Sequence, residues 1–293
     1  MLAMEAAGLT KYYGKSRGIA GVDLSVEEGD FFGFIGPNGA GKSTTIRTFL
    51  GLIKSTEGSA RIFGMDTQKE RTDILSEVGY LPSETTFYSG MKVKDVIRLS
   101  ADLRKKKCRK EAKKLCERLE LDTEKKVEEL SFGNRKKVGI VCALQHKPRL
   151  CILDEPTSGL DPLMQREFFS ILKERNEKGT TIFLSSHILS EVQHYCNRAA
   201  IIRDGQIVAC DSVEALAQTS VKRVHVEGLC ELAGLEGIRD LHYEKESAVF
   251  LYSGQMDLLL NRLAQSPIRD LTITEPDLEE VFMHYYEKGG DQA

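Results

Sequence analysis

Short apolar runs alternate with helical patterns over much of the chain. Phe31–Ile35, Leu150–Leu153 and Thr181–Leu184 have the length of strands and carry apolar residues on both faces, as strands buried in a parallel sheet do. Residues 45–52 continue as a helix after the first run. Because ligands of parallel α/β sheets bind at the carboxyl ends of the strands, we expect the functional site where these runs end.

Two further regions have a different pattern. Residues 84–147 contain helical spacing with many Lys and Glu, which predicts a helical insertion. Within it, Arg104–Lys107 could bind phosphate, although we favour a solvated helix end. From residue 217 to 293 the pattern predicts a small α+β domain with strands at 221–226, 248–252 and 271–273 and helices at 256–264 and 278–287.

Composition narrows the class of protein. Apolar residues make up 41% and charged residues 29%, which is ordinary for a globular chain, and the net charge of −3 argues against a general nucleic-acid binder. The seven Cys form no C-x-x-C pair, which favours a reducing cytosol over a disulfide framework. No stretch approaches the roughly 20 apolar residues of a membrane span, so we expect any membrane role to come through a partner.

A phosphate-binding loop lies between the first apolar run and the helix after it. The segment matches G-x-x-x-x-G-K-[ST], and its glycines allow the backbone N–H groups to converge on one point. Its lysine would reach the β and γ phosphates, and its first serine would ligate Mg²⁺. An ordinary Gly-rich turn is the weaker alternative. The residues of the loop are Gly36, Pro37, Asn38, Gly39, Ala40, Gly41, Lys42, Ser43 and Thr44.

Polar residues follow the other two strands at the edge where the loop is expected. Asp154 ends one strand and is the predicted metal carboxylate, and Glu155 is placed to orient or deprotonate an attacking water. His187 follows the next strand in Leu184–Ile188. The alternatives are that Asp154 and Glu155 simply begin a loop and that His187 is structural; in this sheet we favour catalytic roles.

At this point the sequence resembles the ATP-binding cassette (ABC) proteins. Leu130–Asn134 matches the family's L-S-G-G-Q signature, Ser158–Asp161 its D-loop, and Val78–Pro82 the approach to its Q-loop. His187 matches the switch histidine, and Tyr13 matches the aromatic that stacks on adenine. Tyr12 could stack instead, although we favour Tyr13. The resemblance covers about residues 5–216.

The resemblance implies a P-loop NTPase fold of the α/β class. Its expected parts are a mostly parallel core sheet, an N-terminal antiparallel β-subdomain, the helical insertion and the small C-terminal domain. It implies a nucleotide-binding domain over residues 1–216, ATP and Mg²⁺ as cofactors, and two ATP molecules bound between two cassettes, in a homodimer or with a related cassette. The signature residues of one subunit would contact the nucleotide of the other: Ser131, Phe132, Gly133 and Asn134, together with Asp161 of the D-loop.

Two positions depart from the family pattern. Phe132 replaces the first signature glycine, so its side chain must point away from the nucleotide. Ser83 occupies the place of the Q-loop Gln that reaches Mg²⁺, and a serine is two bonds shorter. A water, or Glu84, could compensate. The resemblance therefore implies activity with altered coupling to a partner.

Two functions follow from the resemblance. The first is the ATP-hydrolysing subunit of an exporter, cytoplasmic and peripheral on the inner face of the cell membrane, with a separately encoded transmembrane permease docking near residues 84–90. The C-terminal ending at 275–282 resembles bacterial drug, antibiotic or ion exporters. The alternative is a soluble ABC ATPase acting on ribosomes or nucleic acid; the single cassette, the absence of long heptads and the acidic charge weigh against it.

Overall fold

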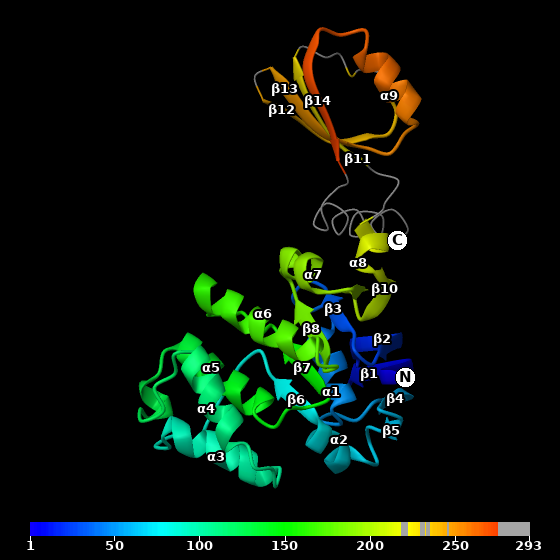
Figure 1. Ribbon diagram of the computed structural model, residues 1–293. Helices are drawn as coiled ribbons and strands as arrows, with labels where there is room; N and C mark the ends of the chain where they lie inside the picture. The colour runs from blue at the N-terminus through cyan, green and yellow to red at the C-terminus, as the bar shows by residue number, and fades with distance from the viewer. Residues whose placement is uncertain (218–221, 229–231, 233–234, 245, 275–293) are drawn as a thin grey trace. The chain divides into compact units, whose positions relative to one another are not determined.

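The chain divides into two compact units, Met1–Cys210 and Asp211–Ala293, whereas the sequence predicts the boundary after residue 216. Among the described residues, no helix is long and apolar enough to cross a membrane. The computed structural model (Figure 1) describes residues 1–217, 222–228, 232, 235–244 and 246–274.

The first unit is built on a six-stranded sheet with the order β10-β9-β3-β8-β7-β6. β3 pairs in parallel with β8 and β9, and β7 pairs in parallel with β6 and β8. Every residue of β3, β7 and β8 is buried, so the prediction of a parallel core sheet is confirmed. The strands are β3 (Phe31–Ile35), β6 (Val78–Leu81), β7 (Leu150–Asp154), β8 (Thr181–Ser186), β9 (Arg198–Arg203) and β10 (Gln206–Ser212).

The helix after β3 is displaced from its predicted position at 45–52. It begins at Lys42, and Gly41 precedes it at φ +107°, a conformation that favours glycine. Gly51, at φ +63°, follows its C-terminal end, so the helix ends earlier than predicted. The shift places Lys42 in the first helical turn. The other helices of the core are α2 (Arg71–Glu77), α6 (Pro162–Asn176) and α7 (Leu189–Tyr195), in addition to α1 (Lys42–Phe49).

An antiparallel sheet with the order β2-β1-β4-β5 forms the N-terminal part of the unit. Burial alternates along the second strand, where Val22, Leu24 and Val26 face inward. They share one apolar cluster with Phe32 and Phe34 of the core sheet, so the main core lies between the two sheets. The strands are β1 (Leu2–Tyr13), β2 (Ser16–Glu27), β4 (Glu57–Ile62) and β5 (Met65–Asp66).

The helical insertion follows β6. One face of its first helix is buried at Val93, Val96, Ile97 and Ala101, which is helical spacing. The helical spacing of residues 109–121 predicts a second helix over that range, but it ends at Arg118 because Glu120 adopts φ +51°. The insertion comprises α3 (Val93–Leu103), α4 (Arg109–Arg118), a 3₁₀ turn at Val127–Glu129 and α5 (Phe132–Leu144).

The second unit has an antiparallel sheet with the order β12-β13-β11-β14. Its own core includes Val224, Phe250 and Leu259. The predicted helix at 278–287 and the ending at 275–282 lie outside the described residues. The elements are α8 (Val213–Ala217), β11 (Lys222–Gly228), β12 (Ile238–Glu244), β13 (Ser247–Tyr252), α9 (Met256–Leu263) and β14 (Ile268–Thr274).

Candidate nucleotide-binding site

The phosphate loop connects the carboxyl end of β3 to α1. Its backbone packs closely on other elements: a Cβ at Gly36 would lie 2.5 Å from the carbonyl oxygen of Ile202, and one at Gly41 would lie 2.9 Å from that of Gly18. Only glycine therefore fits at these two positions. The first N–H groups of α1, which have no intrahelical partner, open at the end of this loop and make it a site for an anion.

Lys42 is buried beside this loop. Its Nζ donates hydrogen bonds to the carbonyl oxygens of Gly36 at 2.6 Å and Pro37 at 3.1 Å. The same atom lies 3.6 Å from Oε1 of Glu155. Burial lowers the pKa of Lys42, and the nearby carboxylates of Glu155 and Asp154 oppose that shift. The ammonium is thus held at the loop by groups that a phosphate could replace.

Asp154 is almost completely buried at the end of β7. Its Oδ2 accepts a hydrogen bond from Ser43 Oγ at 2.9 Å, and its Oδ1 accepts one from Ser185 Oγ at 2.6 Å. The second contact follows from strand register, since Asp154 pairs with Ser185 across the parallel strands. The sequence analysis missed Ser185, although its place two residues before His187 at a strand end was an available signal.

Glu155 turns away from the strand at φ +47°, an uncommon conformation for a residue with a side chain. Its N–H donates to the carbonyl oxygen of Ser185 at 3.1 Å. Its Oε1 then lies 3.2 Å from Nδ1 of His187. The structure therefore brings together Lys42, Asp154, Glu155 and His187 from three separate segments.

Ser43 and Asp154 provide oxygen atoms of the kind that Mg²⁺ prefers. In the part of the chain that the structure describes, no three His, Cys, Asp or Glu side chains are grouped to hold a metal. A cation between Ser43 and Asp154 would therefore complete its shell with oxygens from a ligand or water, as Mg²⁺ does at phosphates. The residues present fit a magnesium–nucleotide site.

The signature residues begin α5. Ser131 caps this helix, and its Oγ accepts a hydrogen bond from the N–H of Asn134 at 3.3 Å. The helix begins at Phe132, whereas the sequence predicts a helix over residues 135–145. Gly133 packs so closely on the D-loop that a Cβ there would lie 2.2 Å from the carbonyl oxygen of Gly159.

Phe132 and Asp161 extend this contact between the signature and the D-loop. The Phe132 ring lies against Gly159, where an added Cβ would lie 2.2 Å from its Cδ1, yet the residue is 46% exposed. Asp161 caps α6 by accepting hydrogen bonds from the N–H groups of Leu163 and Met164. Among the described residues, no hydrogen bond or ion pair joins the signature to Lys42, Glu155 or His187.

Tyr13 lies at the end of β1, beside the last residue of the phosphate loop. A Cβ at Gly18 would lie 2.9 Å from Cε2 of Tyr13 and 3.1 Å from Cγ2 of Thr44, so both side chains border this glycine. Tyr13 is 49% exposed and Tyr12 is 41% exposed. This position near Thr44 favours Tyr13 as the residue that an adenine would reach.

Ser83 follows β6, and the structure brings only its backbone into a defined contact. Its carbonyl oxygen accepts a hydrogen bond from Nζ of Lys136 at 2.8 Å, and that of Pro82 accepts another at 3.1 Å. No hydrogen bond links the described Ser83 hydroxyl to Ser43, Asp154 or Glu155. Its role as a metal ligand therefore stays a prediction.

Lys136 is a second residue that the sequence analysis missed. It is fully buried in α5, and burial lowers its pKa to about 8 against the attraction of Asp154 and Glu155. In the sequence it stands in the charged run Arg135–Lys137, and a charge run is more often an exposed face than a buried cation. The lysine fixes the segment after β6 to the helix that carries the signature.

The fold and the site define an ATP-binding cassette. A family model described as ABC transporter matches residues 19–158. The bacitracin transport ATP-binding protein BcrA of Bacillus licheniformis is 34% identical, with 96% of each chain covered. The chain belongs to the ABC transporter family, and it is an ATPase of that class.

Other similar proteins agree with this assignment. The linearmycin resistance ATP-binding protein LnrL of Bacillus subtilis (strain 168) is 30% identical over 96% of this chain and 97% of the relative. A solved ATP-binding subunit of an ABC transporter is 28% identical with a TM-score of 0.71, covering 74% of this chain and 92% of the other. The ADP conformation of the cassette MJ1267 is 27% identical with a TM-score of 0.63, covering 74% and 94%.

Proposed function

We propose that the chain uses its ATPase activity to power export through a separate membrane subunit, as one half of a nucleotide-bridged dimer. The observation that carries this proposal is the division of the site. The phosphate loop with its carboxylates and the signature both lie in one chain, yet among the described residues no hydrogen bond or ion pair joins the signature to Lys42, Asp154 or Glu155. A second cassette, identical or related, would complete each site.

The residues of the phosphate half have distinct roles in this proposal. Lys42 exchanges its carbonyl partners for β and γ phosphate oxygens, and the first turn of α1 binds the phosphates through N–H groups. Ser43 and Asp154 would hold Mg²⁺, which would neutralise phosphate charge. Tyr13 stacks on the adenine.

Glu155 and His187 would act on the attacking water. The Glu155 carboxylate accepts a proton from the water as it attacks, and His187 holds that carboxylate in place through its Nδ1 contact. From the second subunit, the Ser131 hydroxyl and the N–H groups of the first turn of α5, including that of Gly133, would contact the γ phosphate. Asp161 holds the D-loop at the start of α6.

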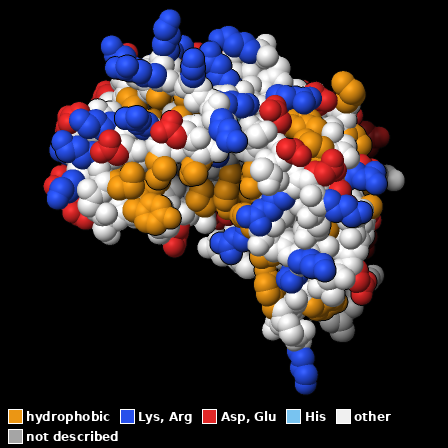
Figure 2. All heavy atoms as spheres, turned by 90° about the horizontal axis from the view of Figure 1, so that it is seen from below, with side chains coloured by type: hydrophobic (Ala, Val, Ile, Leu, Met, Phe, Trp, Pro, Cys, Tyr) orange, Lys and Arg blue, Asp and Glu red, His pale blue; other side chains and the backbone are white. Residues whose placement is uncertain are grey.

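A groove in the helical insertion is the proposed docking site for the membrane subunit. Its volume is about 500 Å³, and Phe87, Tyr88, Leu99 and Leu103 are among its lining residues. Tyr88 and Leu103 are strongly exposed. Figure 2 shows hydrophobic side chains gathered on one face of the molecule with Lys and Arg around them. An amphipathic helix would lay its apolar side into such a groove.

This docking would place the chain on the cytoplasmic face of the membrane. The relatives BcrA and LnrL are named for bacitracin transport and linearmycin resistance, which supports export over the alternative of a ribosome or nucleic-acid ATPase.

A photo-crosslinking residue at Leu103 tests the docking proposal in intact cells. We expect an adduct with a multispanning membrane protein, because Leu103 lines the groove and is 75% exposed. The same residue at Leu258, 55% exposed on α9, is the control. Adducts from Leu103 with ribosomal proteins, or none, would count against the export role.

A further inference from the structure

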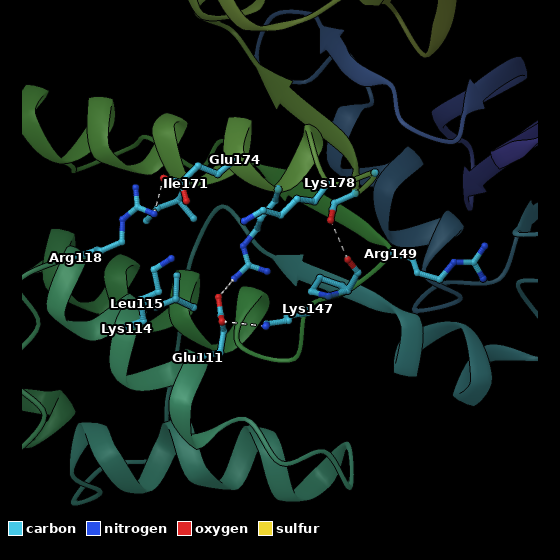
Figure 3. Close-up of a pocket in the computed structure, with 13 residues that line it drawn as sticks. Glu111, Lys114, Leu115, Arg118, Lys147, Arg149, Ile171, Glu174 and Lys178 are labelled. Atoms are coloured by element: carbon cyan, nitrogen blue, oxygen red, sulfur yellow. Dashed lines mark hydrogen bonds and ion pairs between the residues drawn. The ribbon is translucent and has the colours of Figure 1, made fainter.

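A charged pocket lies between the helical insertion and the core (Figure 3). Its volume is about 420 Å³, within the range of small-molecule sites. α4 forms one wall, and the end of α6 forms another. The remaining wall comprises Lys147, Pro148 and Arg149, directly before β7.

Positive charge dominates this pocket. Six of its lining residues are Lys or Arg and two are Glu. Glu111 forms ion pairs with two of the cations. Its carboxylate oxygens lie 2.7 Å from the Arg175 guanidinium and 3.4 Å from the Lys147 ammonium. Glu174 lies 2.8 Å from Arg118. The carboxylates of the pocket are therefore already paired.

Carboxylates just outside the pocket neutralise only part of its excess positive charge. Glu28 pairs with Arg149 at 3.2 Å, and Glu167 pairs with Arg118. With these two included, six cations face four carboxylates, which leaves an excess of two positive charges.

Lys114 and Lys178 account for this excess. They lie on α4 and just beyond the end of α6, so the pocket separates them. Both are exposed, and within the described part of the chain neither ammonium has an ion pair or a hydrogen bond. An anion bound between them would join the insertion to the core while satisfying both.

The pocket and the nucleotide site lie at opposite ends of the same strands. Arg149 and Thr180 immediately precede β7 and β8, whereas Asp154 and Ser185 lie at or near the carboxyl ends of these strands. Five residues of strand span about 16 Å. A ligand in this pocket would therefore not share the phosphate loop.

We propose that this pocket binds a compact anion bearing two or more phosphate groups, which bridges α4 of the insertion and the end of α6. The lining is mostly charged and contains few apolar side chains, which favours a phosphorylated metabolite over an apolar compound. The bound anion would restrain the insertion that carries the docking groove.

Equilibrium dialysis with labelled pyrophosphate tests this site on the full chain without nucleotide. The phosphate loop is also expected to bind pyrophosphate. The measured quantity is therefore the number of bound pyrophosphate equivalents per chain that a charge-reversal variant loses. Lys114→Glu with Lys178→Glu is expected to lose one equivalent per chain, or to bind it at least about tenfold more weakly. The control pair, Lys105→Glu with Lys110→Glu, makes the same charge change at exposed lysines outside the pocket.

Each outcome decides the proposal. Loss of one equivalent in the pocket variant, with the control unchanged, supports the site. Equal binding by wild type and the pocket variant overturns it, as does an equal loss in the control pair. ATPase measured in the same samples verifies folding and the nucleotide site, so a failure here leaves the export role untouched.

Discussion

The two halves of the proposed ATP site differ in how their polar groups are satisfied. In the phosphate half, Ser43, Asp154 and Ser185 are joined by hydrogen bonds, and Glu155 contacts both Lys42 and His187. In the signature half, the contacts are mainly helix caps and packing between the signature and the D-loop.

The difference indicates that one chain can assemble the phosphate half alone, whereas the signature half serves the site of a second chain. The phosphate half is already assembled inside one chain, so a ligand finds its charges and donors in place. The signature half presents a capped helix start with a half-exposed Phe132, and among the described residues no charged side chain of its own chain pairs with Ser131, Phe132 or Gly133. Mutations in the first half should impair chemistry directly, and mutations in the second should impair it only through the partner.

The largest effect is expected from Glu155→Gln. The amide keeps the shape of the side chain but cannot accept the proton of the attacking water, so ATP hydrolysis should fall about a thousandfold. ATP binding should persist, because Lys42 and Asp154 are unchanged, and a nucleotide-bound dimer should accumulate. Phosphate release and light scattering measure the two effects. Normal turnover would remove Glu155 as the group that activates water.

Ser131→Arg tests the other half. The longer side chain would block the helix start from a partner's γ phosphate, and we expect ATPase activity to fall about a hundredfold. Nucleotide binding to the monomer should be retained. Ser212→Arg is the matched control, since Ser212 accepts a hydrogen bond from Ala215 at the start of α8 but lies outside the site. Full activity in Ser131→Arg would contradict a shared site.

Lys136→Met examines the connection between the halves. The carbonyl oxygens of Pro82 and Ser83 lose their donor, which should lower the free energy of unfolding by about 1–3 kcal/mol. Lys106→Met is the control, because Lys106 also donates to a carbonyl, that of Ser76, without full burial. Urea titrations measure both variants.

The same variant should change the dependence of stability on pH. The folded pKa of Lys136, about 8, lies below its ordinary value of 10.5. Between these values the unfolded chain binds more protons, so Lys136 makes wild-type stability rise with pH by at most about 1.4 kcal/mol per unit. Lys136→Met should lack this contribution. An identical slope in both proteins between about pH 8 and about pH 10 would show that burial does not shift this lysine.

Ser83→Gln should have the smallest effect. A glutamine reaches two bonds further than the serine, toward the metal site, so basal ATPase should rise by less than about tenfold. The informative quantity is the ratio of partner-stimulated to basal ATPase. An unchanged ratio would show that this position does not set coupling to the membrane subunit.

The residues of the phosphate half could be proposed from the sequence because their signals are local. The loop, the strand before it and Asp154 at a strand end are read from spacing along the chain. Ser185 depends instead on the register of two parallel strands, and Lys136 is buried by a contact with Pro82 far away in sequence. Such residues become visible only when the strands and helices are placed in space.

Helix boundaries were less predictable for a related reason. α1 begins before its apolar pattern does, because Gly41 and the loop set its first turn. α4 ends just before Glu120, whose positive φ could not be predicted because glutamate has no preference for that conformation. The role of Ser83 also depends on whether its side chain reaches the metal site. The sequence shows only that serine is shorter than the glutamine usual in the family.

The contact of Phe132 and Gly133 with Gly159 has a consequence for when each subunit of the proposed dimer hydrolyses its ATP. Gly159 lies in the loop that leaves Asp154 and Glu155, so we expect a displacement of the signature to be transmitted to these two carboxylates of its own chain. In the proposed dimer, a signature that senses the partner's γ phosphate therefore also reports its presence to its own site. Each subunit would hydrolyse its ATP in response to the state of its neighbour's.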